Sequence, residues 1–278
     1  MNSIEAMKIR KSMRTYEEMP LERESKEKLI NYLKEVSAPF GEKMRFALVE
    51  KNGIKAGAKL GTYGIIKGAE TYLCAIVEKE PRYEENLGYA FEKIILYATA
   101  MGLGTCWLGG TFKRSDFEGA LALKDSELIP IVAPVGYTKQ NRSLIDTLMV
   151  AGAGSKKRKS FQELFFNGSL EQPLKLEDTD GYREAFEMVR IAPSASNKQP
   201  WRIVKEENTF HFYLCRNKNY AKSLAFDIQR LDIGISMCHF ELALKELGCL
   251  GKWTDEKQSS QGKENVEYII SYSIEEEK

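Results

Sequence analysis

The hydrophobic residues of this chain follow two different periods. Between residues 86 and 101 they recur at helical spacing and form a wide apolar face, made of Leu87, Ala90, Phe91, Ile94, Ile95 and Ala98. Alternating or continuous apolar runs predict strands at 44–50, 70–77 and 129–135. The pattern predicts mixed helices and strands, with a central helix at 86–101.

The same order of elements returns in the second half of the chain. A first helix at 22–36 precedes Ala38-Pro39, and a later helix ending at Arg190 precedes Ala192-Pro193. Strands from Trp201, at 209–215 and at 267–273 then enclose a helix at 231–247. The chain is therefore expected to be internally duplicated, with a first half at 1–167 and a second half at 168–278.

Glycine and tryptophan spacings support this duplication. Gly88 and Gly102 are separated by 14 residues, as are Gly234 and Gly248. Trp107 follows Gly88 by 19 residues, and Trp253 follows Gly234 by the same interval. Glycines commonly end helices, so the spacings support the repeated order of elements without proving it.

Composition excludes several classes of protein. The 278 residues include 41 basic and 40 acidic residues, well mixed, which argues against a nucleic-acid or membrane-surface partner. No apolar run reaches the roughly twenty residues that cross a bilayer, and residues 1–12 lack the apolar segment of a signal peptide. A cytoplasmic location is expected.

Cysteine and histidine usage argues against a metal site. The five cysteines show no CxxC spacing and are expected to be reduced thiols. His211 and His239 are the only histidines, and neither has a second ligand type at metal-binding spacing. Since His239 lies in an apolar helical run, we expect a packed helix residue rather than the base of a Ser-His or Cys-His system.

Three segments carry candidate chemistry. Residues 192–201, APSASNKQPW, form a loop rich in small polar residues whose path two prolines and Trp201 constrain. Residues 10–14, RKSMR, bring together three cations and a hydroxyl, and residues 102–110 form a glycine-rich loop after the central helix. A further basic cluster occupies residues 156–159.

These segments resemble the flavin-binding elements of the nitroreductase family, whose members bind FMN between two subunits. One subunit of such a dimer supplies the APSxxNxQPW-type loop, and the other supplies the Arg-Ser-x-Arg and glycine-rich elements. Here the first half keeps the Arg-Ser-x-Arg and glycine-rich elements, and the second half keeps the APSxxNxQPW-type loop. The resemblance implies an α+β, nitroreductase-like fold with mixed and antiparallel sheets surrounded by helices, a pseudo-dimer in one chain, and a single FMN site between its halves.

The first half would contribute the cationic side of that site. Guanidinium groups bind phosphate through charge-assisted hydrogen bonds, so Arg10 and Arg158 are the phosphate candidates, with Ser12 as a neutral donor. Lys11 is expected to contribute weakly. By resemblance, Arg14 reaches toward the flavin ring. The alternatives are a solvated basic N-terminus and, for residues 156–159, a solvated linker.

The glycine-rich loop and the loop at residues 192–201, called the proline-bounded loop below, would enclose the flavin ring. By resemblance, the residues that pass along the ring or meet it from the second half are Trp107, Leu108, Gly109, Gly110, Pro193, Ser194, Ala195 and Asn197. The Asn197 amide could donate to and accept from the pyrimidine edge. The alternatives are a helix end followed by a core tryptophan, and a structured turn before a strand.

The implied activity is that of an FMN-dependent NAD(P)H oxidoreductase. Hydride would pass through flavin N5 to an electron-poor small molecule such as a nitroaromatic or a quinone, and the cofactor carries the chemistry without a catalytic side chain. The fused chain is expected to be monomeric or a weak homo-oligomer. Two alternatives stay open: a flavin-binding protein for storage or sensing without turnover, and an interaction module with a vestigial flavin site.

Overall fold

The structure is a computed structural model that describes residues 1–41, 43–51, 61–139, 157–256 and 264–275. Lys156 of the basic cluster lies outside the described residues. The elements are, in chain order, α1 (Ser3–Ile9), α2 (Arg23–Glu35), β1 (Met44–Glu50), β2 (Thr71–Glu78), α3 (Tyr83–Ala100), β3 (Gly104–Thr105), α4 (Arg114–Glu118), β4 (Glu127–Leu128), β5 (Val132–Gly136), α6 (Phe161–Leu164), β6 (Phe165–Asn167), η2 (Leu176–Asp178), α7 (Arg183–Ile191), η3 (Ala195–Asn197), β7 (Trp201–Glu206), β8 (Thr209–Cys215), α8 (Ile228–Glu246), β9 (Gly251–Thr254) and β10 (Val266–Ile274).

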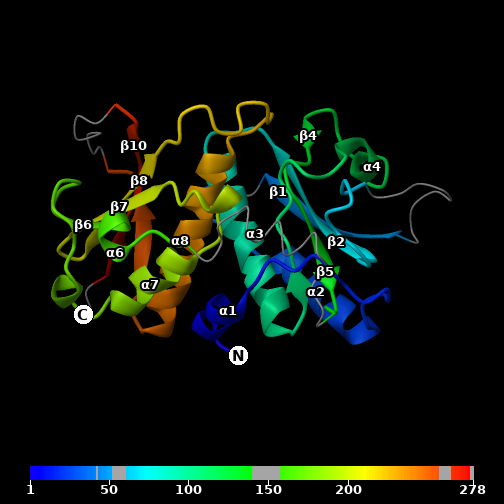
Figure 1. Ribbon diagram of the computed structural model, residues 1–278, viewed down its shortest axis with the longest axis horizontal. Helices are drawn as coiled ribbons and strands as arrows, with labels where there is room; N and C mark the ends of the chain where they lie inside the picture. The colour runs from blue at the N-terminus through cyan, green and yellow to red at the C-terminus, as the bar shows by residue number, and fades with distance from the viewer. Residues whose placement is uncertain (42, 52–60, 140–156, 257–263, 276–278) are drawn as a thin grey trace.

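Two sheets flank a central pair of long helices, α3 and α8 (Figure 1). The first sheet has the order β1-β2-β5-β3, with β4 beside β2, and the second has the order β6-β7-β8-β10-β9. Apart from β4 and β6, both sheets place their strands in the same sequence: first, second, fourth, third. The first sheet is antiparallel, and the second contains one parallel pair, β6 with β7. The α+β class with mixed and antiparallel sheets is therefore confirmed.

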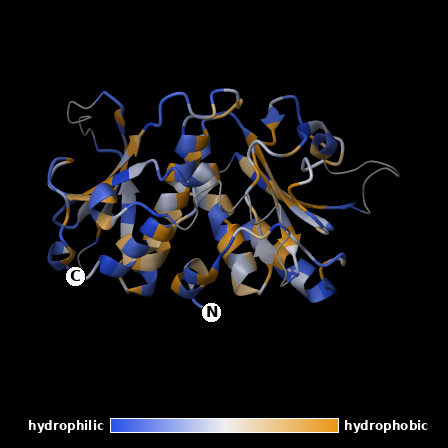
Figure 2. Ribbon diagram, viewed as in Figure 1, coloured by the Kyte–Doolittle hydropathy of each residue, from blue (hydrophilic) through white to orange (hydrophobic). Residues whose placement is uncertain are grey.

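The core is continuous across the central helices. Buried apolar residues of α3, α8 and both sheets form one cluster, and hydrophobic residues concentrate on the strands and inner helices (Figure 2). Leu73 of the first sheet and Phe212 of the second are both fully buried in that cluster. Burial of apolar area is the main stabilising contribution to such a core.

Most predicted elements are confirmed to within a few residues, and β5 shows the clearest shift. The apolar run at 129–135 was expected to pair from its start, yet the strand begins at Val132. The guanidinium of Arg114 donates to the carbonyl oxygens of Ile129 and Pro130 at 3.2 and 3.3 Å. Pro130 has no N–H for a ladder bond, so the first residues of the run are held by a side chain instead.

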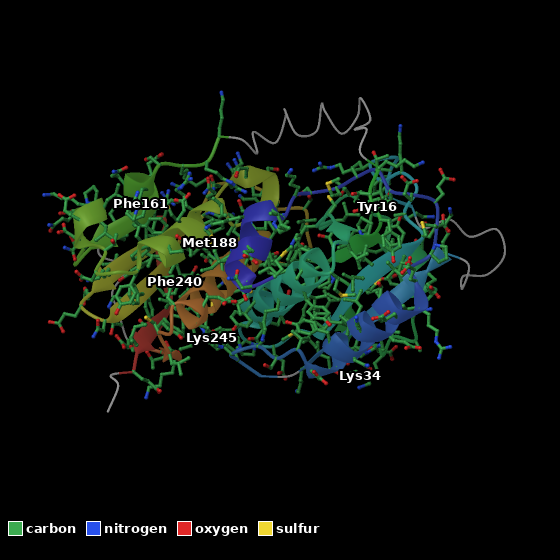
Figure 3. The ribbon with its side chains drawn as sticks, turned by 90° about the horizontal axis from the view of Figure 1, so that it is seen from below. Tyr16, Lys34, Phe161, Met188, Phe240 and Lys245 are labelled. Atoms are coloured by element: carbon green, nitrogen blue, oxygen red, sulfur yellow. The ribbon has the colours of Figure 1, made fainter. Side chains whose placement is uncertain are left out.

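The short helices α1, α4 and α6 and the short strands β3, β4, β6 and β9 were not predicted. In α1, the Asn2 side chain accepts from the Glu5 N–H at 2.8 Å and Glu5 accepts from the Asn2 N–H at 3.0 Å, which is a capping box. The helix lies across α3, α7 and α8 (Figure 3). Its C-cap is Arg10, so the docking of α1 onto the central helices places the first residue of the RKSMR segment.

Candidate functional site

One cavity contains every residue that the sequence predicted to bind a cofactor. Its volume is about 470 Å³, within the range of small-molecule sites. The predicted residues in its lining are Arg10, Lys11, Ser12, Arg14, Trp107, Leu108, Gly109, Gly110, Arg158, Pro193, Ser194, Ala195 and Asn197. Segments from the two ends of the chain thus meet at one place, and the binding role of each residue stays a prediction.

The RKSMR segment is fixed by pairing with the glycine-rich loop. Ser12 forms a parallel bridge with Thr105, and the Met13 N–H donates to the Thr105 carbonyl at 2.8 Å. A Cβ at Gly104 would lie 2.1 Å from the Thr138 side chain and 3.0 Å from the Met13 side chain, so a larger residue would force these side chains to move. The backbone pairing therefore sets the direction of the cations on either side of Ser12.

The glycine-rich loop begins at the end of α3 and crosses the cavity. Gly102 has φ of +80°, which favours glycine and turns the chain out of the helix. Leu108 then pairs with Val132 of β5. A Cβ at Gly109 would lie 3.1 Å from both Ile131 and Ile228, so the backbone passes closely between the first sheet and α8.

Glu92 of α3 joins two of the cavity residues from behind. This fully buried carboxylate accepts from Trp107 Nε1 at 2.8 Å, and Arg10 Nε lies 3.8 Å away. His239 Nε2 of α8 lies 2.9 Å from the other oxygen, and His239 Nδ1 lies 2.9 Å from the Met188 carbonyl. A carbonyl only accepts, so Nδ1 carries a hydrogen and a proton is shared between Nε2 and Glu92. The prediction of a packed His239 is confirmed.

The proline-bounded loop adopts an unusual backbone. Ser196, Asn197 and Gln199 have φ of +47°, +54° and +47°, a conformation that non-glycine residues rarely adopt. Such residues persist where the surroundings hold them, and they cluster at binding sites. Ser194 Oγ accepts from the Gln199 N–H at 2.9 Å, and Tyr220 donates to Ser196 Oγ at 2.9 Å.

Arg158 holds the same loop from the opposite side. Its guanidinium donates to the carbonyls of Ile191 and Ala192, both at 2.9 Å, and to Asn197 Oδ1 at 2.5 Å. Cations are favoured at this position because the carbonyls at the end of α7 point there. Burial, then the charges of Arg10 and Arg190, lower the pKa of Arg158 to about 10, so it remains a cation at neutral pH.

Asn197 and Gln199 have protein partners in this structure. Asn197 Nδ2 donates to the Lys157 carbonyl at 3.0 Å while its Oδ1 accepts from Arg158, so both ends of the amide hold the loop. Gln199 is fully buried, accepts from the Lys159 N–H and donates to the Arg190 carbonyl. Gln199 is therefore part of the scaffold of the loop, and Asn197 supports the loop as well as lining the cavity.

Sequence reasoning missed the apolar wall and one carboxyl group. Helix α8 presents residues 228, 231, 232 and 235, which share one helical face. This spacing was the available signal, but the run was interpreted only as a helix at 231–247. The lining residues not predicted are Ile65, Cys106, Thr111, Ile131, Ser196, Ile228, Leu231, Asp232 and Ile235.

Further observations limit the chemistry. The five cysteines are free, as expected from their spacing. Over the described ranges of the chain, no group of three or more His, Cys, Asp or Glu side chains could hold a metal ion. Within those same ranges, no helix has both the length and the apolar character that a bilayer crossing requires.

The family follows from the sequence as a whole. The sequence model of a family described as "Putative TM nitroreductase" matches residues 2–244. The chain belongs to this nitroreductase family. Membership in this family indicates the general kind of activity, which is that of an oxidoreductase. A search of curated proteins found no match.

Several solved structures are similar to this nitroreductase-family chain, and the first of them supports the fold. A "putative nitroreductase" from Thermotoga maritima has a TM-score of 0.60 at 20% identity, covering 99% of this chain and 93% of that chain. A nitroreductase with bound FMN from Bacteroides fragilis has a TM-score of 0.42 at 18% identity, covering 52% of this chain and 92% of that chain. An FMN-dependent nitroreductase from Clostridium difficile has a TM-score of 0.39 at 19% identity, covering 50% and 88%.

Proposed function

We propose that this nitroreductase-family chain is an FMN-dependent NAD(P)H oxidoreductase with one cofactor site. The observation that carries the proposal is the single cavity in which the RKSMR segment, the glycine-rich loop and the proline-bounded loop meet. Family membership supplies the kind of reaction, and the cavity supplies a place for the cofactor that this reaction needs.

The cationic part of the lining suits a phosphate. Arg10, Lys11, Arg14 and Arg158 all line the cavity. The Arg10 side chain is 8% exposed, and its buried Nε has no hydrogen-bond partner in the part of the chain that the structure describes. An unsatisfied buried guanidinium N–H is costly, and a phosphate oxygen would satisfy it. The FMN phosphate is therefore assigned to Arg10, with Ser12 as a neutral donor.

The rest of the lining suits a flat aromatic ring. Ile65, Ile131, Ile228, Leu231 and Ile235 form an apolar wall. The glycine-rich loop permits a close approach of its backbone, and Arg14 adds a cation that would stabilise negative charge on a reduced ring. The residue types fit FMN at both its charged and its apolar parts.

Bound FMN would supply two-electron chemistry, taking hydride from NADH or NADPH and giving it to an electron-poor acceptor such as a nitroaromatic or quinone. The chain's own residues bind, orient and desolvate. Arg10 and Ser12 fix the phosphate, the apolar wall excludes water, and Arg158 with Asn197 holds the proline-bounded loop in place.

The halves at 1–167 and 168–278 are proposed to be fused copies of one ancestral subunit. The shared strand order of the two sheets and the pairing of α3 with α8 support this proposal. The cavity draws its cations and glycine-rich loop from the first half and the proline-bounded loop from the second. Fusion would then replace the usual dimer by one chain.

Titration with FMN tests the cofactor. We expect about one FMN per chain by absorbance, and weaker binding by at most a few kcal/mol for Arg10→Ala and for Asn197→Ala. Arg23→Ala is a matched control, because Arg23 is 92% exposed and pairs with Glu27 on α2. Two FMN per chain, or an effect of only one of the two cavity variants, would contradict the shared site.

A second measurement separates an enzyme from a carrier. Rapid bleaching of bound flavin by NADH or NADPH, followed by its reoxidation by a quinone, is expected of the enzyme. A flavin-storage or sensing protein would bind FMN without rapid bleaching. A protein that stays colourless after FMN addition, with no change in its thermal unfolding, would be an interaction module.

A further inference from the structure

Asp232 is a buried carboxyl group in the wall of the cavity. It lies on the cavity face of α8 and is 1% exposed. Its two oxygens lie 3.0 and 3.2 Å from one donor, the N–H of Ala195 in the proline-bounded loop. No other hydrogen bond and no ion pair to Asp232 is found among the described residues. A single N–H leaves most of the hydrogen-bonding capacity of the carboxyl group unused.

In the first half of the chain, an amide side chain accepts a hydrogen bond at the position that corresponds to Asp232. Asn86 of α3 lies 146 residues before Asp232, the interval that also separates Gly88 from Gly234. Asn86 Oδ1 accepts from the Phe40 N–H at 2.8 Å, in the loop that follows Ala38-Pro39. Asp232 accepts from the loop that follows Ala192-Pro193. Holding this loop therefore requires an acceptor oxygen but not a carboxyl group.

The position also makes an ionised carboxyl group costly. Burial raises the pKa of Asp232 well above its usual value, the Ala195 N–H lowers it, and the charge of Asp227 raises it further. Asp232 also acts electrostatically on Tyr220, whose own pKa is raised mainly by burial and further by Asp232. Arg10, Arg14 and Arg158 share the cavity, but no ion pair joins them to Asp232 in the described ranges. An unpaired buried charge favours the neutral form.

We propose that Asp232, as a neutral carboxylic acid, is a flavin-binding residue that holds Ala195 with one oxygen and donates its own O–H into the cavity. The proposal rests on the FMN site proposed above and adds a group that the family resemblance did not indicate. Asn86 cannot titrate, so the exchangeable proton is confined to the half that supplies the proline-bounded loop. Flavin binding and this proton are then coupled.

The coupling between flavin binding and the Asp232 proton predicts how flavin affinity changes with pH. A ligand that accepts a hydrogen bond from the acid form binds that form better, so its affinity falls when Asp232 loses its proton. Above the pKa of Asp232, affinity should fall by up to about tenfold per pH unit. The phosphate of FMN has its own ionisation near a pKa of about 6, whereas riboflavin lacks that group, so riboflavin isolates the effect of Asp232.

The experiment compares dissociation constants of riboflavin and FMN across the whole pH range in which the protein stays folded, for the wild type, Asp232→Asn and Asn86→Asp. We expect the wild type and Asn86→Asp to lose riboflavin affinity as pH rises, and Asp232→Asn to be flat. The native Asn86 shows that an amide suits this type of position. Asn86→Asp places a carboxyl group at the counterpart position outside the cavity lining.

The outcomes separate the two proposals. A flat riboflavin profile in the wild type, or the same slope in Asp232→Asn, would overturn the role of Asp232 while leaving the FMN site intact. Absence of any flavin binding by the wild type would reject the proposed cofactor, and the role of Asp232 with it. Should Asp232→Asn fold poorly, the carboxyl ¹³C signal of Asp232 in the wild-type protein, with and without riboflavin, decides the question. A pKa that rises on binding supports the proposal, and an unchanged pKa contradicts it.

Discussion

Gly88 of α3 and Gly234 of α8 each lie against the backbone of the opposite helix. A Cβ at Gly88 would be 2.0 Å from the Leu231 carbonyl oxygen, and a Cβ at Gly234 would be 2.0 Å from the Glu85 carbonyl oxygen. The contact is reciprocal, and the two glycines are 146 residues apart. This close approach sets the spacing of the two central helices, and α8 in turn forms a wall of the cavity.

Alanine at either glycine should therefore destabilise the protein. Neither carbonyl can move without shifting its helix, so we expect Gly88→Ala and Gly234→Ala each to lower the free energy of unfolding by about 1–3 kcal/mol or more. Gly119→Ala is the control, since its Cβ would make only an ordinary contact at 3.4 Å from the Ser115 oxygen. Urea denaturation measures the difference, and equal stability of all three variants would show that the helices are not held this closely.

Substitutions of Trp107 and Trp253, which occupy corresponding positions in the two halves, should distinguish an effect on stability from an effect on FMN binding. Trp107 donates to Glu92 at 2.8 Å and Trp253 donates to Glu241 at 2.6 Å, but only Trp107 lines the cavity. Replacing either by Phe removes one of the donors to a buried carboxylate and should cost about 1–3 kcal/mol of stability. Only Trp107→Phe should also weaken FMN binding, measured by quenching of flavin fluorescence. A similar loss in Trp253→Phe would mean that the effect is global.

Arg158 should matter for the shape of the proline-bounded loop. Arg158→Leu removes hydrogen bonds to two carbonyls and to Asn197, so the strained backbone at 196–199 should relax. We expect faster amide hydrogen exchange in this loop and at least tenfold weaker FMN binding, at about 1.4 kcal/mol per tenfold. Arg158→Lys keeps the charge but not the forked donors and should recover only part of the affinity. Full recovery with Lys would show that charge alone is needed.

Stability should depend on pH through Asp232. Its pKa is raised in the folded state, so the folded protein holds this proton more tightly than the unfolded chain. The associated stability is fully present below the unfolded pKa of about 4 and is lost as pH rises toward the folded value. Asp232→Asn should therefore gain stability relative to the wild type as pH rises, with the smallest difference in acid. Denaturation of the cofactor-free protein at several pH values measures this, and a constant difference would contradict it.

The sequence determined the local structure and the chemical types at the site. Strand β1 at Met44–Glu50 and strand β8 at Thr209–Cys215 match the predicted ranges, because alternating or continuous apolar runs define strands locally. The RKSMR and APSASNKQPW segments could be selected by resemblance, since their cations, prolines and small polar residues are visible in the sequence. The short helix α1 was missed because seven residues carry little periodic signal.

The way in which those pieces combine is visible only in the folded chain. Folding brought Arg10 and Asn197, from opposite ends of the chain, into one cavity, and it engaged the Asn197 amide with Arg158 and the Lys157 carbonyl. It also placed Asp232 in the cavity wall, although the pattern around it predicted only a helix. Periodicity reports which face of a helix is buried, whereas the partner of that face depends on contacts between residues far apart in sequence.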